Sequence, residues 1–361
     1  MKVAVGLAFL LLLVPAASAS STRPRTILTT RGSLVGFAQD GSRLAVATVG
    51  GGQRCGIAIR VHDLRNGRER LLTTRRGPTC GLYAEPGGDG FDLVYRGGTA
   101  IWELQYGAHF NYQDVYESSL ARPRDRFVEE LVYDNDSYFT GEHVTALAGG
   151  ATPFYGWYTQ SVQGSDDCDL ELTCTVVVTR GGIHRVDARG RVTALAGAPP
   201  TAALAVAHGR VALVRATPDV VWYAPPGMTS TVEVRNAGTG KLVTSFDLHG
   251  RVRALALSRG TLAVLVSDGG AARIDRYAPT TGVPVGSTPV PAAKEHDLSI
   301  AGHRVAFRVG ARIELLDTAN GSVRTIARTR GDVIGLSIQG RRIAWGQNAG
   351  THGVVRAVVV S

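Results

Sequence analysis

Long apolar runs are absent from this sequence, except for one at its start. Residues 3–14 are apolar, follow Met1 and Lys2, and precede Ala17, Ser18 and Ala19, which form a small-residue cleavage signal. The run is shorter than the roughly 20 residues that cross a bilayer as a helix, and it is typical of a secretory signal peptide. We therefore predict a signal peptide at residues 1–19, one secreted or periplasmic cell-envelope domain at residues 20–361, and no membrane span.

Cysteine is scarce, with four residues in the whole chain, and no C-x-x-C spacing or flanking histidine accompanies them. This excludes the usual zinc sites and suits an oxidising compartment. Four cysteines allow three pairings. Cys168 and Cys174 flank one short loop, and Cys55 and Cys80 lie in adjacent predicted elements. We expect the disulfides Cys55–Cys80 and Cys168–Cys174.

Glycine, in contrast, is abundant and punctuates a repeated hairpin. Each copy has an alternating strand, a glycine turn and a denser apolar strand, and a second strand pair follows it in most units. Self-similarity of this kind indicates a repeat architecture. The copies occupy residues 35–46, 204–213, 255–264, 298–307 and 336–345.

The repeat period predicts the fold. Seven units of about 49 residues are within the range of propeller blades with their loops. We predict an all-β fold, a β-propeller of seven four-stranded blades. Six or eight blades remain open, because the second and third units, near residues 80–121 and 126–197, are irregular. A β-sandwich, the structural alternative, does not explain the period.

One strand at the start of the predicted domain lacks a hairpin partner. Residues 26–32 match residues 70–77 and 324–331, which close their own units, whereas the last unit, residues 332–361, contains only three strands. We expect residues 25–30 to pair with residues 354–360, which closes the ring and hides two sheet edges.

The turns at residues 236–242 and 317–321 resemble those of bacterial WD-repeat-like, TolB-like and YVTN-type β-propellers. The G-H and W-D dipeptides of eukaryotic WD repeats are missing, and no tryptophan follows the turn as in quinoprotein propellers. The resemblance implies a propeller fold, and it does not imply a quinone cofactor. These propeller families include both binding scaffolds and enzymes, so the fold does not determine the function.

Catalytic motifs are also missing: the sequence has no G-x-S-x-G elbow, P-loop or H-E-x-x-H pattern. Its histidines are scattered. We therefore expect no catalytic residue, metal or cofactor. The alternative is a propeller enzyme, a lyase or a hydrolase of the lactonase type, whose acids or histidines converge on the axis from different blades.

More than half of the aromatic residues lie between Trp102 and Tyr158, together with many carboxylates. Exposed tyrosine and tryptophan provide large contact areas with a polar handle, which suits ligand binding, although packing between blades is the interpretation of these aromatics that the sequence favours. We predict a secreted, monomeric, non-catalytic scaffold that binds an extracellular or envelope protein, a peptide or a glycan. The expected ligand-binding residues are Tyr112, Tyr116, Tyr133, Asp134, Asp136, Tyr138 and Trp157.

The formal net charge is +9. Arginines gather at residues 65–76, 122–126 and 324–330. Attraction to anionic envelope polymers is one interpretation. The other, which we favour on the sequence alone, is that charges on the outermost strands block edge pairing. Nucleic acid is not expected as a partner of a secreted protein.

Overall fold

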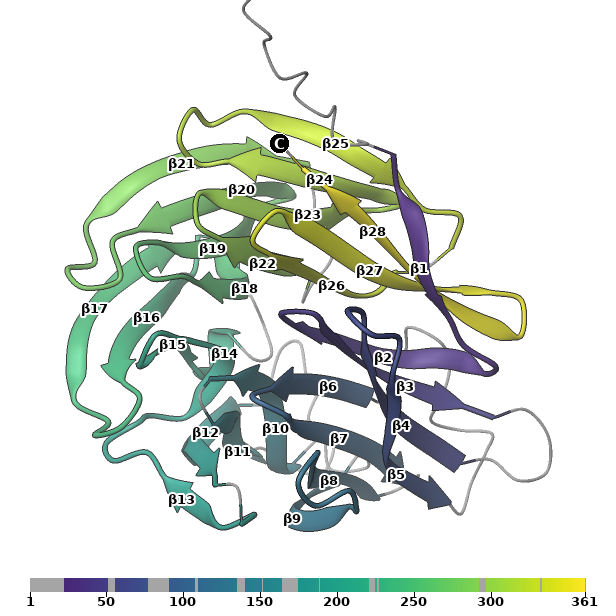
Figure 1. Cartoon of the computed structure of the whole chain (residues 1–361). Helices are drawn as coiled ribbons and strands as arrows, with labels where there is room; N and C mark the ends of the chain where they lie inside the picture. Colours follow the sequence, from purple (N-terminus) through teal and green to yellow (C-terminus); the bar gives the residue numbers. More distant parts are fainter. Residues whose placement is uncertain are drawn as a thin grey trace, which may run out of the picture.

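The computed structural model describes residues 23–50, 56–76, 91–107, 110–134, 140–150, 152–163, 175–187, 189–220, 225, 227–291, 297–331 and 333–360. These residues form seven four-stranded antiparallel blades around a central axis (Figure 1). The predicted all-β propeller with seven blades is confirmed.

The first three blades occupy the N-terminal half of the chain. Blade 1 contains β2 (Ser33–Asp40), β3 (Arg43–Val49), β4 (Gly56–Asp63) and β5 (Glu69–Arg76). Blade 2 contains β6 (Phe91–Arg96), β7 (Thr99–Gly107), β8 (Phe110–Ser119) and β9 (Arg126–Asp134). Blade 3 contains β10 (Thr140–Gly149), β11 (Pro153–Gln163), β12 (Thr175–Val186) and β13 (Val192–Ala194).

The remaining blades follow in order. Blade 4 contains β14 (Thr201–Ala207), β15 (Arg210–Arg215), β16 (Thr229–Asn236) and β17 (Leu242–His249). Blade 5 contains β18 (Arg251–Leu257), β19 (Leu262–Asp268), β20 (Ala271–Tyr277) and β21 (Pro284–Val290). Blade 6 contains β22 (Leu298–Ala301), β23 (Arg304–Val309), β24 (Arg312–Asp317) and β25 (Val323–Arg328). Blade 7 contains β26 (Val333–Gln339), β27 (Arg342–Ala349), β28 (His352–Val359) and β1 (Arg25–Thr29).

The repeated hairpin forms the first and second strands of each blade whose sequence contains it. The second strand is covered on both faces, because neighbouring blades pack against it, and this explains its dense apolar sequence. An alanine with no exposed surface occupies the same position of the repeat in five blades. These residues are Ala45, Ala212, Ala263, Ala306 and Ala344.

The predicted boundary between the second and third units is wrong. Residues 126–134 form β9, the last strand of blade 2, rather than the start of blade 3. Asp134 and Tyr133 of β9 also pair with Thr140 and Gly141 of β10, so blades 2 and 3 share one eight-stranded sheet. Because β9 pairs with both β8 and β10, the sequence pattern does not mark the boundary between blades 2 and 3.

The predicted ring closure is confirmed. Strand β1 pairs antiparallel with β28, with Arg25 opposite Ala357 and Thr29 opposite Val354. Figure 1 shows the purple N-terminal strand beside the yellow C-terminal strands. The first and last described strands therefore belong to one blade.

Asn348 ties this closing blade to blade 1. Its Oδ1 accepts a hydrogen bond from the Leu34 backbone nitrogen at 2.7 Å, and its Nδ2 donates to the Leu34 carbonyl at 3.1 Å. Leu34 is fully buried. The amide thus satisfies both backbone groups of a core residue at the junction between blades 7 and 1.

Glycine is required where blades 1 and 2 meet. A Cβ on Gly36 would lie 2.6 Å from Cε1 of the Phe91 ring, well inside contact distance. Any larger residue in this position of β2 would push blade 2 away from blade 1.

The part of the chain that the structure describes contains no helix with the length and apolar character needed to cross a membrane. The cysteines of both predicted disulfides, Cys55, Cys80, Cys168 and Cys174, lie outside the described residues. The short loop that Cys168 and Cys174 flank lies outside them as well.

Deleting residues 20–30 should remove β1 and expose the hydrogen-bonding edge of β28. Unpaired edges promote association, so we expect oligomers in size-exclusion chromatography with light scattering, and a lower melting temperature. Deleting residues 20–24, which precede β1, should leave both properties unchanged. A monomeric protein with unchanged melting temperature after the longer deletion would contradict the closing role of β1.

Candidate binding site in the central channel

A channel with a volume of about 1280 Å³ runs between the blades. The first strand of every blade, from β2 to β26, contributes to its wall. Seven strands far apart in the sequence therefore converge on one cavity. A concave site of this kind, reached by many elements, is the usual place for a ligand.

Most of the channel wall consists of small and aliphatic side chains, such as Ala205, Ala256 and Ser337. Charged groups are interspersed among them. Arg308 lies 3.4 Å from Asp297, and Arg253 Nε donates to Ser267 Oγ at 2.7 Å. Among the described residues of this wall there is no histidine.

Glu103 in this wall has a raised pKa. Burial, reinforced by the nearby Asp92 carboxylate, raises the pKa of Glu103 to about 8, although Gln113 donates a 2.8 Å hydrogen bond to its Oε1. Gln113 Oε1 in turn accepts from the Val144 backbone nitrogen at 2.8 Å. This chain links β7 and β8 of blade 2 to β10 of blade 3. A neutral Glu103 at pH 7 is therefore part of the contact between the two blades.

The predicted aromatic site is not gathered in this channel. Tyr116 is 1% exposed, stacks on Trp102 with ring centroids 5.7 Å apart, and lies under the Arg75 guanidinium. Its ring packs blade 2 against blade 1, and it presents no surface to a ligand. Tyr112 and Trp157 are half-buried on β8 and β11.

For the four remaining predicted ligand-binding residues, no side-chain contacts are described. Tyr133 and Asp134 lie at the end of β9, and only their backbone is described. Asp136 and Tyr138 lie outside the described residues. Their role as ligand contacts stays a prediction.

A polar residue recurs on the third strand of each blade, opposite a buried residue of the second strand. We call this the third-strand polar position. Its members are Arg60, Tyr116, His184, Glu233, Asp275, Glu314 and Arg356. In six blades the residue has a polar partner nearby, such as Glu69 for Arg60 and Arg273 for Asp275.

His184 at this position contacts Glu129 and Tyr155, an arrangement that resembles a catalytic cluster. Its Nδ1 lies 3.1 Å from Glu129 Oε2 and 2.8 Å from the Tyr155 hydroxyl. Burial would raise the pKa of Glu129, but the hydrogen bonds from His184 and Tyr155 hold it below its usual value. Because equivalent positions in other blades hold ion pairs, this cluster is one more structural contact of the repeat, and here it joins β9 to β11 and β12.

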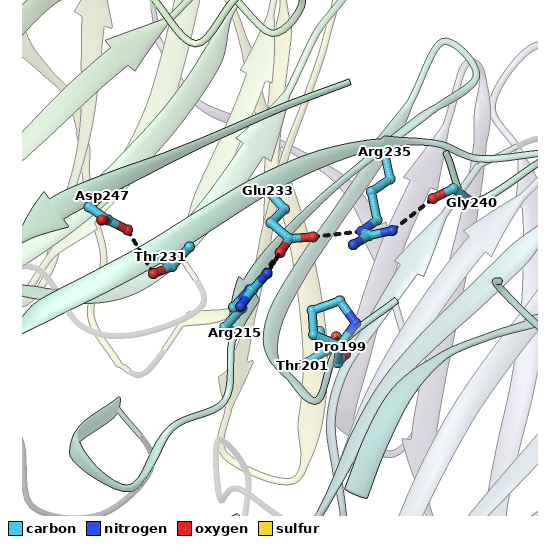
Figure 2. A network of polar contacts seen from close by, with 8 residues as sticks. All are labelled: Pro199, Thr201, Arg215, Thr231, Glu233, Arg235, Gly240 and Asp247. Atoms are coloured by element: carbon cyan, nitrogen blue, oxygen red, sulfur yellow. Dashed lines mark hydrogen bonds and ion pairs between the residues drawn. The ribbon is translucent and has the colours of Figure 1, made fainter. Parts of the chain in front are cut away.

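Glu233 shows the third-strand polar position at its most buried. Its carboxylate has no exposed surface and lies between two guanidinium groups, 2.5 Å from Arg215 and 2.6 Å from Arg235 (Figure 2). Arg235 also donates to the Gly240 carbonyl at 2.9 Å. A buried charge is tolerated only with such partners, because desolvating an unpaired carboxylate costs several kcal/mol or more.

Neither the channel wall nor the third-strand polar position was predicted from the sequence. The sequence contained a signal for the polar position, because in blades 1 to 6 these residues stand three positions before the first residue of the turn between the third and fourth strands. Their differing chemistry hid the equivalence. Arginine, tyrosine, histidine and carboxylates do not look like one repeated feature.

Comparison of structures supports this architecture. No known family profile matches the sequence, and no curated protein matches it. The propeller domain of the Trilobed protease from Pyrococcus furiosus is similar over 92% of this chain and 94% of that one, with 8% identity and a TM-score of 0.55. The chain is a seven-bladed β-propeller. The Pyrococcus domain is described as having an open velcro topology, whereas β1 and β28 are paired here.

Two further similar structures come from different proteins. The match to the WD40 domain of Neurospora crassa Pan2 covers 94% of this chain and 96% of that one, at 12% identity and a TM-score of 0.50. The match to a puromycin hydrolase covers 91% of this chain and only 53% of the hydrolase, at 12% identity and a TM-score of 0.54. The propeller therefore corresponds to about half the length of that enzyme. At these identities the similarity shows the fold alone.

Replacing Glu233 by Gln should destabilise the propeller by about 2 to 4 kcal/mol, because Arg215 and Arg235 lose their charged partner. Asp247→Asn is the matched control in the same blade. Asp247 accepts a 2.7 Å hydrogen bond from Thr231 at the exposed surface, and its replacement should cost less than about 1 kcal/mol. Urea unfolding measures both. Equal effects of the two substitutions would contradict the role assigned to the buried pair.

Replacing Glu103 by Gln should change how stability depends on pH. The folded protein holds the Glu103 proton up to a pKa of about 8, whereas the unfolded chain releases it near 4.5. The free energy of unfolding therefore falls between these values as pH rises, by at most about 1.4 kcal/mol per pH unit. The glutamine of the variant has no proton to lose, so the variant should gain stability relative to the wild type from pH 5 to pH 8. Parallel stability curves in denaturant titrations would contradict this.

Proposed function

We propose that this protein is a secreted, non-catalytic scaffold that binds a peptide, protein or glycan partner in the central channel. The observation that carries the proposal is the convergence of all seven first strands on one cavity of about 1280 Å³. The polar clusters give less support to the alternative, an enzymatic function. Several of their members, including Glu233 and His184, are engaged in contacts that hold the strands together.

Secretion is the part of the proposal that rests on residues 1–19. A cleaved signal peptide would place the propeller in the envelope or outside the cell, where the partner would also be found. Mass spectrometry of the protein from the producing cells should then find Ser20 as the first residue.

The channel itself can be tested with one substitution. Ser337 lies in the channel wall on β26, and Ser337→Trp would place a large ring in the cavity. Ser322→Trp adds the same ring at an exposed turn and is the control. The measurement is binding to peptide and glycan arrays, followed by the ligand-induced shift of the melting temperature.

We expect the wild type and Ser322→Trp to bind the same ligand, and Ser337→Trp to lose it while keeping its circular dichroism spectrum. Ser337→Leu is a smaller change that serves as a second variant in case Ser337→Trp perturbs folding. It should also weaken binding. Equal binding by all variants would contradict a channel site. Conversion of a bound ligand into products would favour the alternative function, an enzyme with an axial site.

A further inference from the structure

One end of the propeller collects the turns between the first and second strands and those between the third and fourth strands of the blades. The turn between the third and fourth strands is hydrogen-bonded to the turn between the first and second strands of the same blade. The Leu64 backbone nitrogen donates to the Ser42 carbonyl, and Ala237 and Thr318 repeat this contact with Gly209 and His303. We call this end the hairpin face. Connections between blades lie at the opposite end, since each blade is an antiparallel sheet of four strands.

A second cavity of about 730 Å³ opens on the hairpin face, around the channel mouth. It shares Arg96, Val206, Leu257 and Ile300 with the channel, so the two are continuous. Basic residues from five blades line this mouth. They are Arg96, His208, Arg259, His303, Arg304 and Arg341. Among the described residues of the mouth there is no aspartate or glutamate.

Two arginines of the mouth, Arg259 and Arg341, are available to a partner. Arg259 and Arg341 are exposed, and neither has a carboxylate partner within the described chain. Arg341 donates through its Nε to the Val360 carbonyl, at 2.8 Å. Arg96 is also exposed and lies 3.1 Å from Asp40. Like charges arranged around an opening create a positive potential that attracts anions.

Two carboxylates lie next to members of this rim. Asp317 is 3.9 Å from His303, and Asp40 is 3.1 Å from Arg96. The turns between third and fourth strands add further exposed basic residues, including Arg65 and Arg189. Arg259 and Arg341, which have no carboxylate partner among the described residues, are therefore the rim charges that a partner can pair with.

Aliphatic side chains lie directly beneath the basic rim. Val206 and Ile300 are half-buried in the mouth, and their strands continue into the channel wall. A ligand that fits this surface carries carboxylates around its edge and apolar groups at its centre. A polypeptide segment with acidic and aliphatic side chains has this chemistry, because each residue supplies one or the other.

We propose that the hairpin face binds an acidic polypeptide segment of a partner protein. Its carboxylates pair with Arg259 and Arg341, and an aliphatic side chain enters the channel mouth beside Val206 and Ile300. This inference rests on the proposed scaffold function and specifies the chemistry of the partner.

The test uses the mature full-length protein and a short fluorescein-labelled peptide of glutamates interspersed with leucines. Fluorescence anisotropy measures its affinity at low and at physiological salt. Arg259→Glu combined with Arg341→Glu should weaken binding by about tenfold or more. Arg31→Glu combined with Arg328→Glu changes the net charge equally but lies on exposed residues at the opposite end of blades 7 and 6, and it should leave binding unchanged.

Control ligands define the partner chemistry. A peptide with glutamines in place of glutamates should bind weakly, and one with alanines in place of leucines should also lose affinity. Equal weakening by both double variants would overturn the proposal, since long-range charge alone would then explain binding. Polyphosphate or a sulfated glycan that binds as tightly as the peptide, with the same dependence on Arg259 and Arg341, would overturn the assignment to a polypeptide.

Failure of the acidic-partner proposal is distinguishable from failure of the proposed scaffold function. A protein that binds a neutral peptide or a glycan in the arrays, with the loss expected for Ser337→Trp, keeps the scaffold function and contradicts only the acidic partner. A protein that binds neither the arrays nor the acidic peptide contradicts both.

Discussion

Pairing between β1 and β28 is the contact on which the rest of the structure depends. The two faces of each blade are covered by the neighbouring blades, so the apolar second strands are all buried only when the ring is complete. Arg25 and Thr29 come from one end of the described chain, and Ala357 and Val354 from the other. Their backbone pairing, with the Asn348 bridge to Leu34, fixes blade 7 against blade 1. Closure also holds the seven first strands around one axis, so the channel exists as a consequence of the same contact.

The third-strand polar position shows how the repeat places charge inside a packed ring. A carboxylate such as Glu233 gains little net stability from burial, because desolvation offsets most of the attraction to its arginines. Its partners still make the arrangement specific: an unpaired Glu233 facing an apolar neighbour would be strongly unfavourable. The paired charges therefore help to fix the strand register within the blade. The Glu129, Tyr155 and His184 contacts at blade 3 do the same with different residues.

Most of the fold was predictable from the sequence, because strand alternation and glycine turns are local and recur in the same order. The boundary between blades 2 and 3 was not, since β9 and β10 pair across it. Tyr116 looked like a ligand contact from composition, and only three-dimensional packing shows it beneath Arg75. The basic residues of the channel mouth were not predictable from the sequence for a different reason. Arg259, Arg304 and Arg341 are separated by tens of residues, and the repeat geometry alone brings them to one opening.

The turn at Gln339–Arg342 explains how this opening combines a fixed backbone with variable chemistry. Gly340 has a φ of +59°, and a Cβ built on it would meet nothing within 4 Å, so backbone conformation rather than space favours glycine there. The adjacent Arg341 carries no such constraint, because its side chain is exposed at the mouth. In blade 6 the equivalent residue is His303, which follows Gly302 at the same rim, whereas His208 of blade 4 reaches the rim with a φ of +49° of its own. The turn does not require a basic residue at the position of Arg341 and His303. The charge of the rim is therefore the feature of this propeller that is best explained by what it binds.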